Sequence, residues 1–197
     1  MPKVFEKDVV YDYSPLHTLN YLHRKYPNPF ATHVYTVDTL SRTVDPETGL
    51  IRSERLIGVQ QGAPAWIAKL FHLPETAHVR EVVFIDPAEP KAICFSMNLS
   101  LKQYISCLEH ITYSPFRNGK LHTGADDSTA NLEPGVPGPG AALPSTLFTQ
   151  RAVISSGFSS SMVARRIEKA SLDRFGKNAG VGKKGFEWVL AGGQEKR

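Results

Sequence analysis

The sequence predicts an α+β domain in which helices pack against one face of a single antiparallel sheet. The first observation is the order of elements: a strand and a helix come first, about six strand-like segments follow, and helical segments end the chain. The second is that short proline-containing turns join several successive strands, which is typical of hairpins. With 197 residues, 41% of them apolar, the chain can form one sizeable core, so we expect a single domain over 1–197.

The first predicted strand covers residues 3–13, where apolar and polar side chains alternate loosely. Ser14 and Pro15 then begin a helix, because serine can cap a helix N-terminus and proline fits the first helical position. We expect this helix to end before Pro27, since a proline disfavours the helical conformation in the residue that precedes it.

Alternating side chains predict most of the sheet in the middle of the chain. The segments concerned are 32–44, 50–61, 77–86, 91–99, 104–113 and 147–156. The turns at 45–49 and 87–90 contain proline and acidic residues, so the strands on either side of each turn should form a hairpin.

Residues 117–145 differ in composition from the rest of the chain. Glycine and proline recur there and aliphatic periodicity is lost. We favour a disordered insertion between two strands over a functional loop.

The C-terminal part predicts a long helix from about Ser159 to Lys177, a break at Gly180–Gly182 and a short final helix. At about 100° per residue, Arg174 falls inside the apolar stripe of the long helix. An unpaired buried cation is costly, so Arg174 either pairs with a strand carboxylate, or reaches the helix edge, or binds the anionic head of a ligand. Helix geometry alone favours the first two possibilities.

Charged residues also recur on otherwise apolar strand faces. Arg55, Glu81 and Glu109 each alternate with apolar neighbours in a predicted strand. This pattern indicates either an internal ion network or a cavity with a polar end, and a sheet with one wetted face would also produce it.

The stretch from Tyr26 to Phe71 contains two predicted strands and ends in a short apolar helix that begins at Pro64. Such a segment must be hidden or inserted into another apolar phase. Its large side chains are Trp66, Ile67, Leu70 and Phe71. We interpret it as a movable cover over a cavity for an amphiphile.

Composition and motifs exclude several other function classes. A net charge of +4 favours anionic partners only mildly, and no basic cluster interleaved with aromatics supports nucleic-acid binding. Two cysteines and scattered histidines give neither a disulfide framework nor a metal site, and no cofactor motif is present. The segments 155–161 and 176–184 match neither a serine nucleophile elbow nor a phosphate-binding loop, so we expect no enzyme activity.

The sequence resembles the PRELI-like family, which includes the slowmo proteins and fungal relatives of the mitochondrial intermembrane space. The resemblance covers nearly the whole chain except 117–145. Its main segments are Arg24–Pro29, His33-Val34, Glu54–Leu56, Pro64–Trp66, Arg80–Val82, Thr112–Pro115 and Lys184–Leu190.

The resemblance implies about seven antiparallel strands curved around a long C-terminal helix, similar to START and phosphatidylinositol-transfer proteins, with a cavity for one phospholipid. It further implies transfer of phosphatidylserine or phosphatidic acid between the outer and inner mitochondrial membranes, through transient contact with these anionic membranes. The implied partner is a small helical protein with twin Cys-x9-Cys motifs in the intermembrane space. The implied lid consists of Pro64, Trp66, Ile67, Leu70 and Phe71.

Carried over by position, the resemblance implies a head-group site at Lys25, His33, Arg55, Arg174 and Asn178. Val59-Gln60-Gln61-Gly62 before the lid is less basic than in the phosphatidic-acid branch, and Ala179-Gly180-Val181 lacks a further lysine. The sequence is therefore similar to the phosphatidylserine-transferring fungal branch. Phosphatidic-acid transfer, a non-transferring interaction module and, more distantly, an enzyme acting on a bound lipid are the alternatives.

Overall fold

The computed structural model describes residues 2–60, 68–69, 72–117, 120–121 and 144–193. All of the strands in it belong to one antiparallel sheet. The strands are β1 (Lys3–Tyr11), β2 (Val34–Val44), β3 (Ile51–Gln60), β4 (Thr76–Asp86), β5 (Lys91–Asn98), β6 (Ile105–Arg117), β7 (Lys120–Leu121) and β8 (Ser145–Ser156). Their order is β1-β8-β6-β5-β4-β3-β2, with β7 paired only to β6. The predicted α+β class with a seven-stranded curved sheet is thus confirmed.

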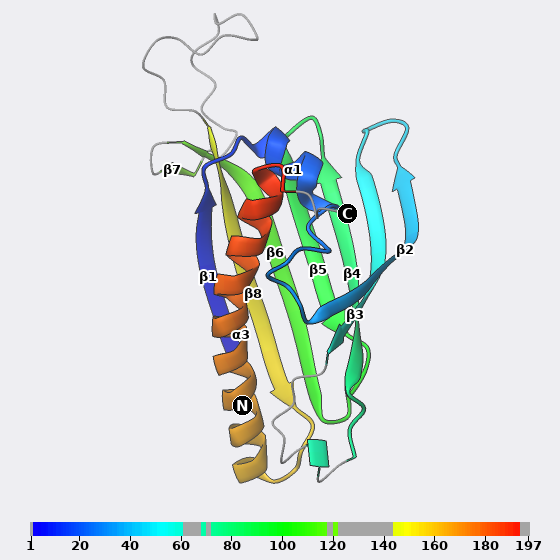
Figure 1. The fold of residues 1–197 in the computed structure, drawn as a ribbon, viewed down its shortest axis with the longest axis vertical. Coiled ribbons are helices and arrows are strands. Elements are labelled where there is room, and N and C mark those ends of the chain that lie inside the picture. The colour runs from blue at the N-terminus through cyan, green and yellow to red at the C-terminus, as the bar shows by residue number, and fades with distance from the viewer. Residues whose placement is uncertain (1, 61–67, 70–71, 118–119, 122–143, 194–197) are drawn as a thin grey trace, which may run out of the picture.

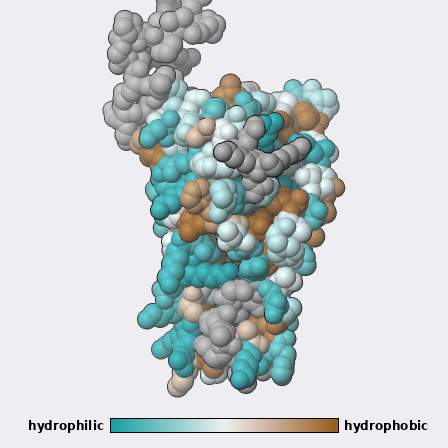
Figure 2. Space-filling view, in the orientation of Figure 1, coloured by the Kyte–Doolittle hydropathy of each residue, from teal (hydrophilic) through white to brown (hydrophobic). Residues whose placement is uncertain are grey.

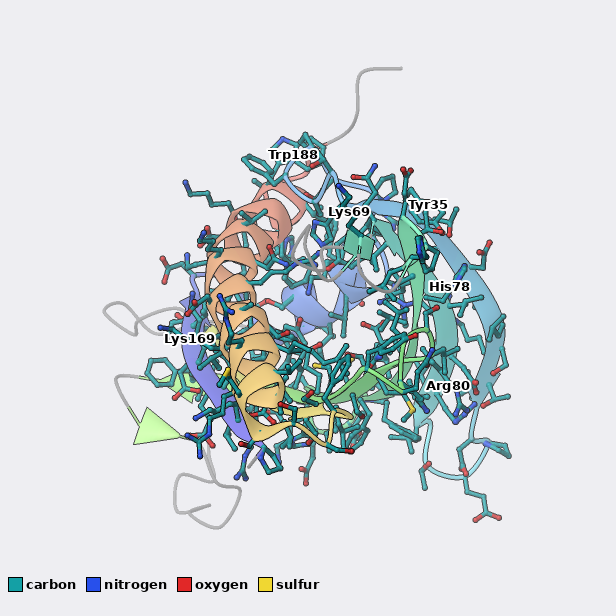
Figure 3. The ribbon with its side chains drawn as sticks, turned by 90° about the horizontal axis from the view of Figure 1, so that it is seen from below. Tyr35, Lys69, His78, Arg80, Lys169 and Trp188 are labelled. Atoms are coloured by element: carbon teal, nitrogen blue, oxygen red, sulfur yellow. The ribbon has the colours of Figure 1, made fainter. Side chains whose placement is uncertain are left out.

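The sheet is strongly curved, and the long helix α3 (Ser161–Leu190) lies across its concave side against β1 and β8 (Figures 1 and 3). Hydrophilic side chains cover most of the surface over α3 in the view of Figure 2. Its buried residues include Ile167, Phe186 and Leu190. The apolar side of α3 therefore faces the sheet, as its sequence stripe predicts.

The helix α1 (Pro15–Leu22) begins as predicted, with the Ser14 hydroxyl accepting from the N–H of His17 at 3.3 Å. It ends four residues earlier than expected. The reason is a turn held by Asn28, whose side chain donates to the carbonyl of Lys25 and accepts from the N–H groups of Phe30 and Ala31. These bonds satisfy backbone N–H and C=O groups of the turn without a helix. The helix α1 therefore ends before it reaches Pro27.

The predicted break at Gly180–Gly182 is wrong, because α3 continues through it to Leu190. Each interior glycine costs a helix about 1 kcal/mol relative to alanine. Burial of Phe186, Val189 and Leu190 beyond the glycines offsets this cost, since anchoring a large apolar side chain contributes about 1.5–3 kcal/mol.

The packed core lies at the end of the molecule where α1 meets the last turns of α3 (Figure 1). Tyr11 and Phe186 meet edge to face with ring centroids 5.4 Å apart, and Tyr113 and Phe148 meet at 5.2 Å. Solid packing is therefore concentrated at this end.

The segment 117–145 lies mostly outside the described residues. Strand structure enters it at both ends, since β6 runs to Arg117, β7 covers 120–121 and β8 begins at Ser145. The predicted limits of the insertion are thus too wide at these edges.

Candidate functional site

A cavity of about 370 Å³ lies between the concave face of the sheet and α3. This volume is within the range of pockets that hold small organic molecules. Much of its wall is apolar, and the apolar side chains come from six strands and α3. They include Val9, Ile57, Val59, Val79, Ile111, Ile154, Ile167 and Ala170. The side chains that alternation places on the inner face of the strands therefore line a hollow as well as a core.

Lys25 supplies a cation at the end of the cavity next to the packed core. Its ammonium lies 5.5 Å from the ring centre of Tyr26 and 6.0 Å from that of Phe186. Burial lowers the pKa of Lys25, but Tyr26, Tyr113, Tyr11 and Glu81 outweigh it and raise the pKa well above its ordinary value. The side chain is therefore an ammonium at neutral pH, and it faces the cavity without a carboxylate within 4.0 Å in the described part of the chain.

Arg174 supplies a second cation from the middle of α3. Its guanidinium donates to the Gln60 carbonyl at 3.4 Å, and no ion pair to it is found among residues 2–60, 72–117 or 144–193. Burial lowers the pKa of Arg174, while burial and then the Arg174 charge lower the pKa of His33. His33 is consequently a neutral imidazole at neutral pH, and Asn178 lines the same cavity one helical turn beyond Arg174.

Arg55 does not line the cavity, unlike the other four predicted head-group residues. Its Nε donates to Glu81 Oε1 at 2.8 Å, its Nη2 donates to the same oxygen, and only 2% of its surface is exposed. A further bond from Nη1 reaches the His23 carbonyl at 3.3 Å. The structure thus realises the internal ion network that was one interpretation of this strand pattern.

A row of polar side chains crosses the inner face of the sheet. Cross-strand pairing aligns Arg55 with Glu81, Glu81 with Ser96, and Ser96 with Glu109 on four successive strands. The Ser96 hydroxyl donates to Glu109 Oε1 at 2.7 Å, and the Gln150 amide donates to Glu109 Oε2. Sequence reasoning found Glu81 and Glu109 by their alternation, but it missed Ser96 and Gln150, because only the strand register brings them to Glu109.

The predicted lid residues Pro64, Trp66, Ile67, Leu70 and Phe71 lie outside the described residues. The neighbouring Ala68 and Lys69 are helical and lie at the end of the molecule opposite α1 (Figures 1 and 3). The N–H of Leu73 donates to the Ala68 carbonyl at 3.0 Å, and Leu73 lines the cavity. The C-terminal end of the segment between β3 and β4 therefore reaches the cavity wall.

Other kinds of site are not found in the described part of the chain. None of its His, Cys, Asp and Glu side chains form a group of three or more that could hold a metal ion. Cys94 and Cys107 are free thiols, both with a raised pKa caused first by burial. Within the same residues, no helix combines the length and apolar composition needed to cross a membrane.

The chain is similar in sequence to a group of curated proteins. A model of the PRELI-like family matches residues 19–134. UPS2 of Saccharomyces cerevisiae, named as mitochondrial, is 34% identical over 85% of this chain but only 63% of its own length. The UPS-like protein C36.10 of Schizosaccharomyces pombe is 33% identical over 95% of this chain and 89% of its own. The human PRELI domain-containing protein 1, also named as mitochondrial, is 26% identical over 85% of this chain and 66% of its own.

Solved structures with similar folds share little sequence with this chain. The protein TTHA0849 from Thermus thermophilus has a TM-score of 0.54 and 8% identity, and the match covers 98% of this chain and 100% of its own. The Zhui aromatase/cyclase from Streptomyces sp. R1128 has a TM-score of 0.56 and 10% identity, and the match covers 97% and 94%. At these identities the likeness concerns the fold alone.

Proposed function

Because the chain belongs to the PRELI-like family, we propose that it transfers phospholipid between the mitochondrial outer and inner membranes, one molecule per cavity. The place of action is the intermembrane space, and phosphatidylserine is the preferred cargo. Two relatives named as mitochondrial support the compartment.

The cavity is the observation that carries this proposal. Its apolar strand faces match acyl chains, whereas Lys25 and Arg174 offer two cations without carboxylate partners among the described residues. A guanidinium and an ammonium both suit a lipid phosphate. A site for an apolar molecule with an anionic head follows from this combination, and a phospholipid has both parts.

Transfer requires extraction, shielding and release, with no covalent step. The net charge of +4 favours approach to an anionic membrane, where the apolar segment 64–73 inserts among the lipids. Exposing acyl chains to water costs about 0.8 kcal/mol per CH₂. Closure of that segment over the loaded cavity is therefore part of the proposed cycle.

The choice of phosphatidylserine over phosphatidic acid is supported by a limited number of cavity cations. Val59 and Gln60 line the cavity just before the proposed lid, where a lysine would add charge. Ala179 and Gly182 line it beyond Asn178, again without a cation. A head group that contains its own ammonium needs less positive charge from the protein.

A small helical protein with twin Cys-x9-Cys motifs is proposed as the heterodimer partner. Membership of the family supports this assignment. Co-purification of the chain with such a protein from mitochondria would support the assignment, and isolation of a stable monomer without one would count against it.

Two measurements on the whole chain test the proposed function. Native mass spectrometry should find one phospholipid retained per protein molecule. A liposome assay with fluorescent donor lipids should show transfer of phosphatidylserine faster than that of phosphatidic acid. An empty protein that moves no lipid, but binds a protein partner permanently, would favour an interaction module instead.

A further inference from the structure

Glu109 is a cavity-lining carboxylate whose charge is not balanced by a neighbouring cation where the structure describes the chain. Its two oxygens accept hydrogen bonds from Ser96 and Gln150, both of which are neutral. No lysine, arginine or histidine lies within 4.0 Å of it in the described part of the chain. The other acidic group on this wall, Glu81, already pairs with Arg55.

The two hydrogen bonds do not exhaust the capacity of Glu109. A carboxylate has about four acceptor positions, so each oxygen can accept another donor. Filling the cavity with a ligand removes water from the carboxylate, and a desolvated charge without a partner is costly. A neutral glutamine can also bridge Ser96 and Gln150, with its oxygen accepting from Gln150 and its amide donating to the Ser96 hydroxyl. A carboxylate at this position therefore favours a ligand that contributes a cation.

The position of Glu109 relative to Lys25 fits a zwitterion. Glu81 and Glu109 lie two strand spacings apart, or about 10 Å. Lys25 lies on the Glu81 side, because it follows two residues after His23, whose carbonyl accepts from Arg55, the partner of Glu81. Lys25 and Glu109 both line the cavity. A positive group and an unbalanced negative group thus face one short stretch of cavity.

We propose that Glu109 binds the primary ammonium of an aminophospholipid, with the phosphate of that lipid turned toward Lys25. This assignment rests on the proposed transfer function and names the residue that selects the head group. Phosphatidylserine and phosphatidylethanolamine both contain the ammonium, whereas phosphatidic acid does not. Glu109 therefore discriminates between lipids with and without this group, and it does so through charge rather than through size.

The test is transfer of defined lipids by the full chain carrying Glu109→Gln, which keeps the shape and removes the charge. Loss of one member of a desolvated charge pair weakens binding, largely because the other charge is left without a partner. The ratio of phosphatidylserine to phosphatidic-acid transfer should therefore fall at least about tenfold. Phosphatidylethanolamine should follow phosphatidylserine. The matched control is Glu89→Gln, because Glu89 pairs with Lys91 in an exposed turn away from the cavity.

A change in the lipid gives a second and independent readout on the unmodified protein. N-acetylated phosphatidylserine keeps its phosphate and carboxylate but has no ammonium. The unmodified chain should transfer it at least about tenfold more slowly than phosphatidylserine, and Glu109→Gln should cause little further loss. This arm decides the question even if the variant does not fold.

The outcomes separate this inference from the proposed function. An unchanged lipid ratio in a folded Glu109→Gln variant overturns the inference, as does an equal loss for lipids with and without the ammonium. Equal transfer of the acetylated and free lipids by the unmodified chain also overturns it. A chain that transfers no phospholipid of any kind overturns the proposed function itself.

Discussion

Arg174 reaches the cavity from the same helix that exposes Lys169 on its outer surface (Figure 3). Arg174→Glu should lower phospholipid transfer by about a hundredfold, because it replaces a phosphate-binding cation with an anion. The free energy of unfolding should change by less than about 1 kcal/mol, since Arg174 is only partly buried. Lys169→Glu makes the same charge change away from the cavity and is the control. A folded Arg174→Glu chain with full activity would exclude Arg174 from head-group binding.

Arg55 and Glu81 give a prediction about stability. Arg55→Met leaves the Glu81 carboxylate buried without its cation, so the free energy of unfolding should fall by about 3–5 kcal/mol. Adding Glu81→Gln should recover much of this loss, because the unpaired charge is then gone. A double-mutant cycle in urea measures the coupling directly. Additive effects of the two substitutions would contradict a paired role.

His23 gives a prediction about pH. Burial, followed by Arg42 and Arg55, lowers the pKa of His23 from 6.5 to about 4, and its Nδ1 has no hydrogen-bond partner among the described residues. Between these values the unfolded chain binds a proton that the folded chain does not. The free energy of unfolding should therefore fall as pH falls from 6.5 to 4, by on the order of 1 kcal/mol because the ring is only partly buried.

Urea unfolding at several pH values between 4 and 7 measures this dependence. His23→Gln should flatten it, whereas His78→Gln, on the outer surface in Figure 3, serves as the comparison. An equally steep profile in the His23 variant would assign the effect to other groups.

At the scale of the element, two glycines of α3 should respond oppositely to the same change. A Cβ at Gly180 meets nothing within 4 Å, so Gly180→Ala should raise the free energy of unfolding by about 0.5–1 kcal/mol. A Cβ at Gly185 would lie 2.6 Å from Asn28 Oδ1. Gly185→Ala should therefore cost about 1–3 kcal/mol, since Asn28 holds the turn after α1. Thermal or urea unfolding of both variants is the measurement. A change of the same sign in the free energy of unfolding of both variants would contradict this prediction.

The sequence predicts a strand or helix well where a single local signal, such as side-chain periodicity or a helix cap, determines it. Alternation locates the strands because the side-chain period of a strand is two, and Ser14-Pro15 locates the start of α1 because both residues suit a helix N-terminus. Local signals give a wrong prediction where packing between residues distant in sequence determines the structure. The glycines at 180 and 182 predict a break, but burial of Phe186 against the ring of Tyr11 keeps α3 continuous.

At the scale of the whole molecule, pairing between distant segments decides what the sequence cannot show. The first strand, β1, lies beside the last, β8, and no local pattern specifies that neighbour. Pairing of β8 with β6, its neighbour on the other side, brings Gln150 to Glu109. Alternation therefore places Glu109 on an apolar face, but only the assembled sheet shows that the carboxylate faces a cavity, with no cation of the described residues beside it. Only the family resemblance predicts a role for Lys25 and His33, since their loop has no periodicity that would predict the direction of these side chains.

The segment between β6 and β8 tests whether this fold depends on all of its length. The two strands stay in register up to Phe116 and Ser145, so the sheet closes without the intervening residues. The family model, however, extends to residue 134, well inside the segment. Deletion of 123–142 shortens the connection to about a quarter of its length, which should raise the free energy of unfolding by about 1 kcal/mol through a smaller loop-closure entropy.

Phosphatidylserine transfer should remain within about twofold of the full chain if the segment is a tolerated insertion. Replacing 123–142 with a Gly/Ser segment of equal length separates the two possible causes of a change. Loss of transfer in both variants would show that the native sequence of the segment is needed, whereas loss in the deletion alone would show that its length is needed. Either result would contradict the interpretation as a tolerated insertion, because in a tolerated insertion the cavity and its charges, all outside the segment, suffice for transfer.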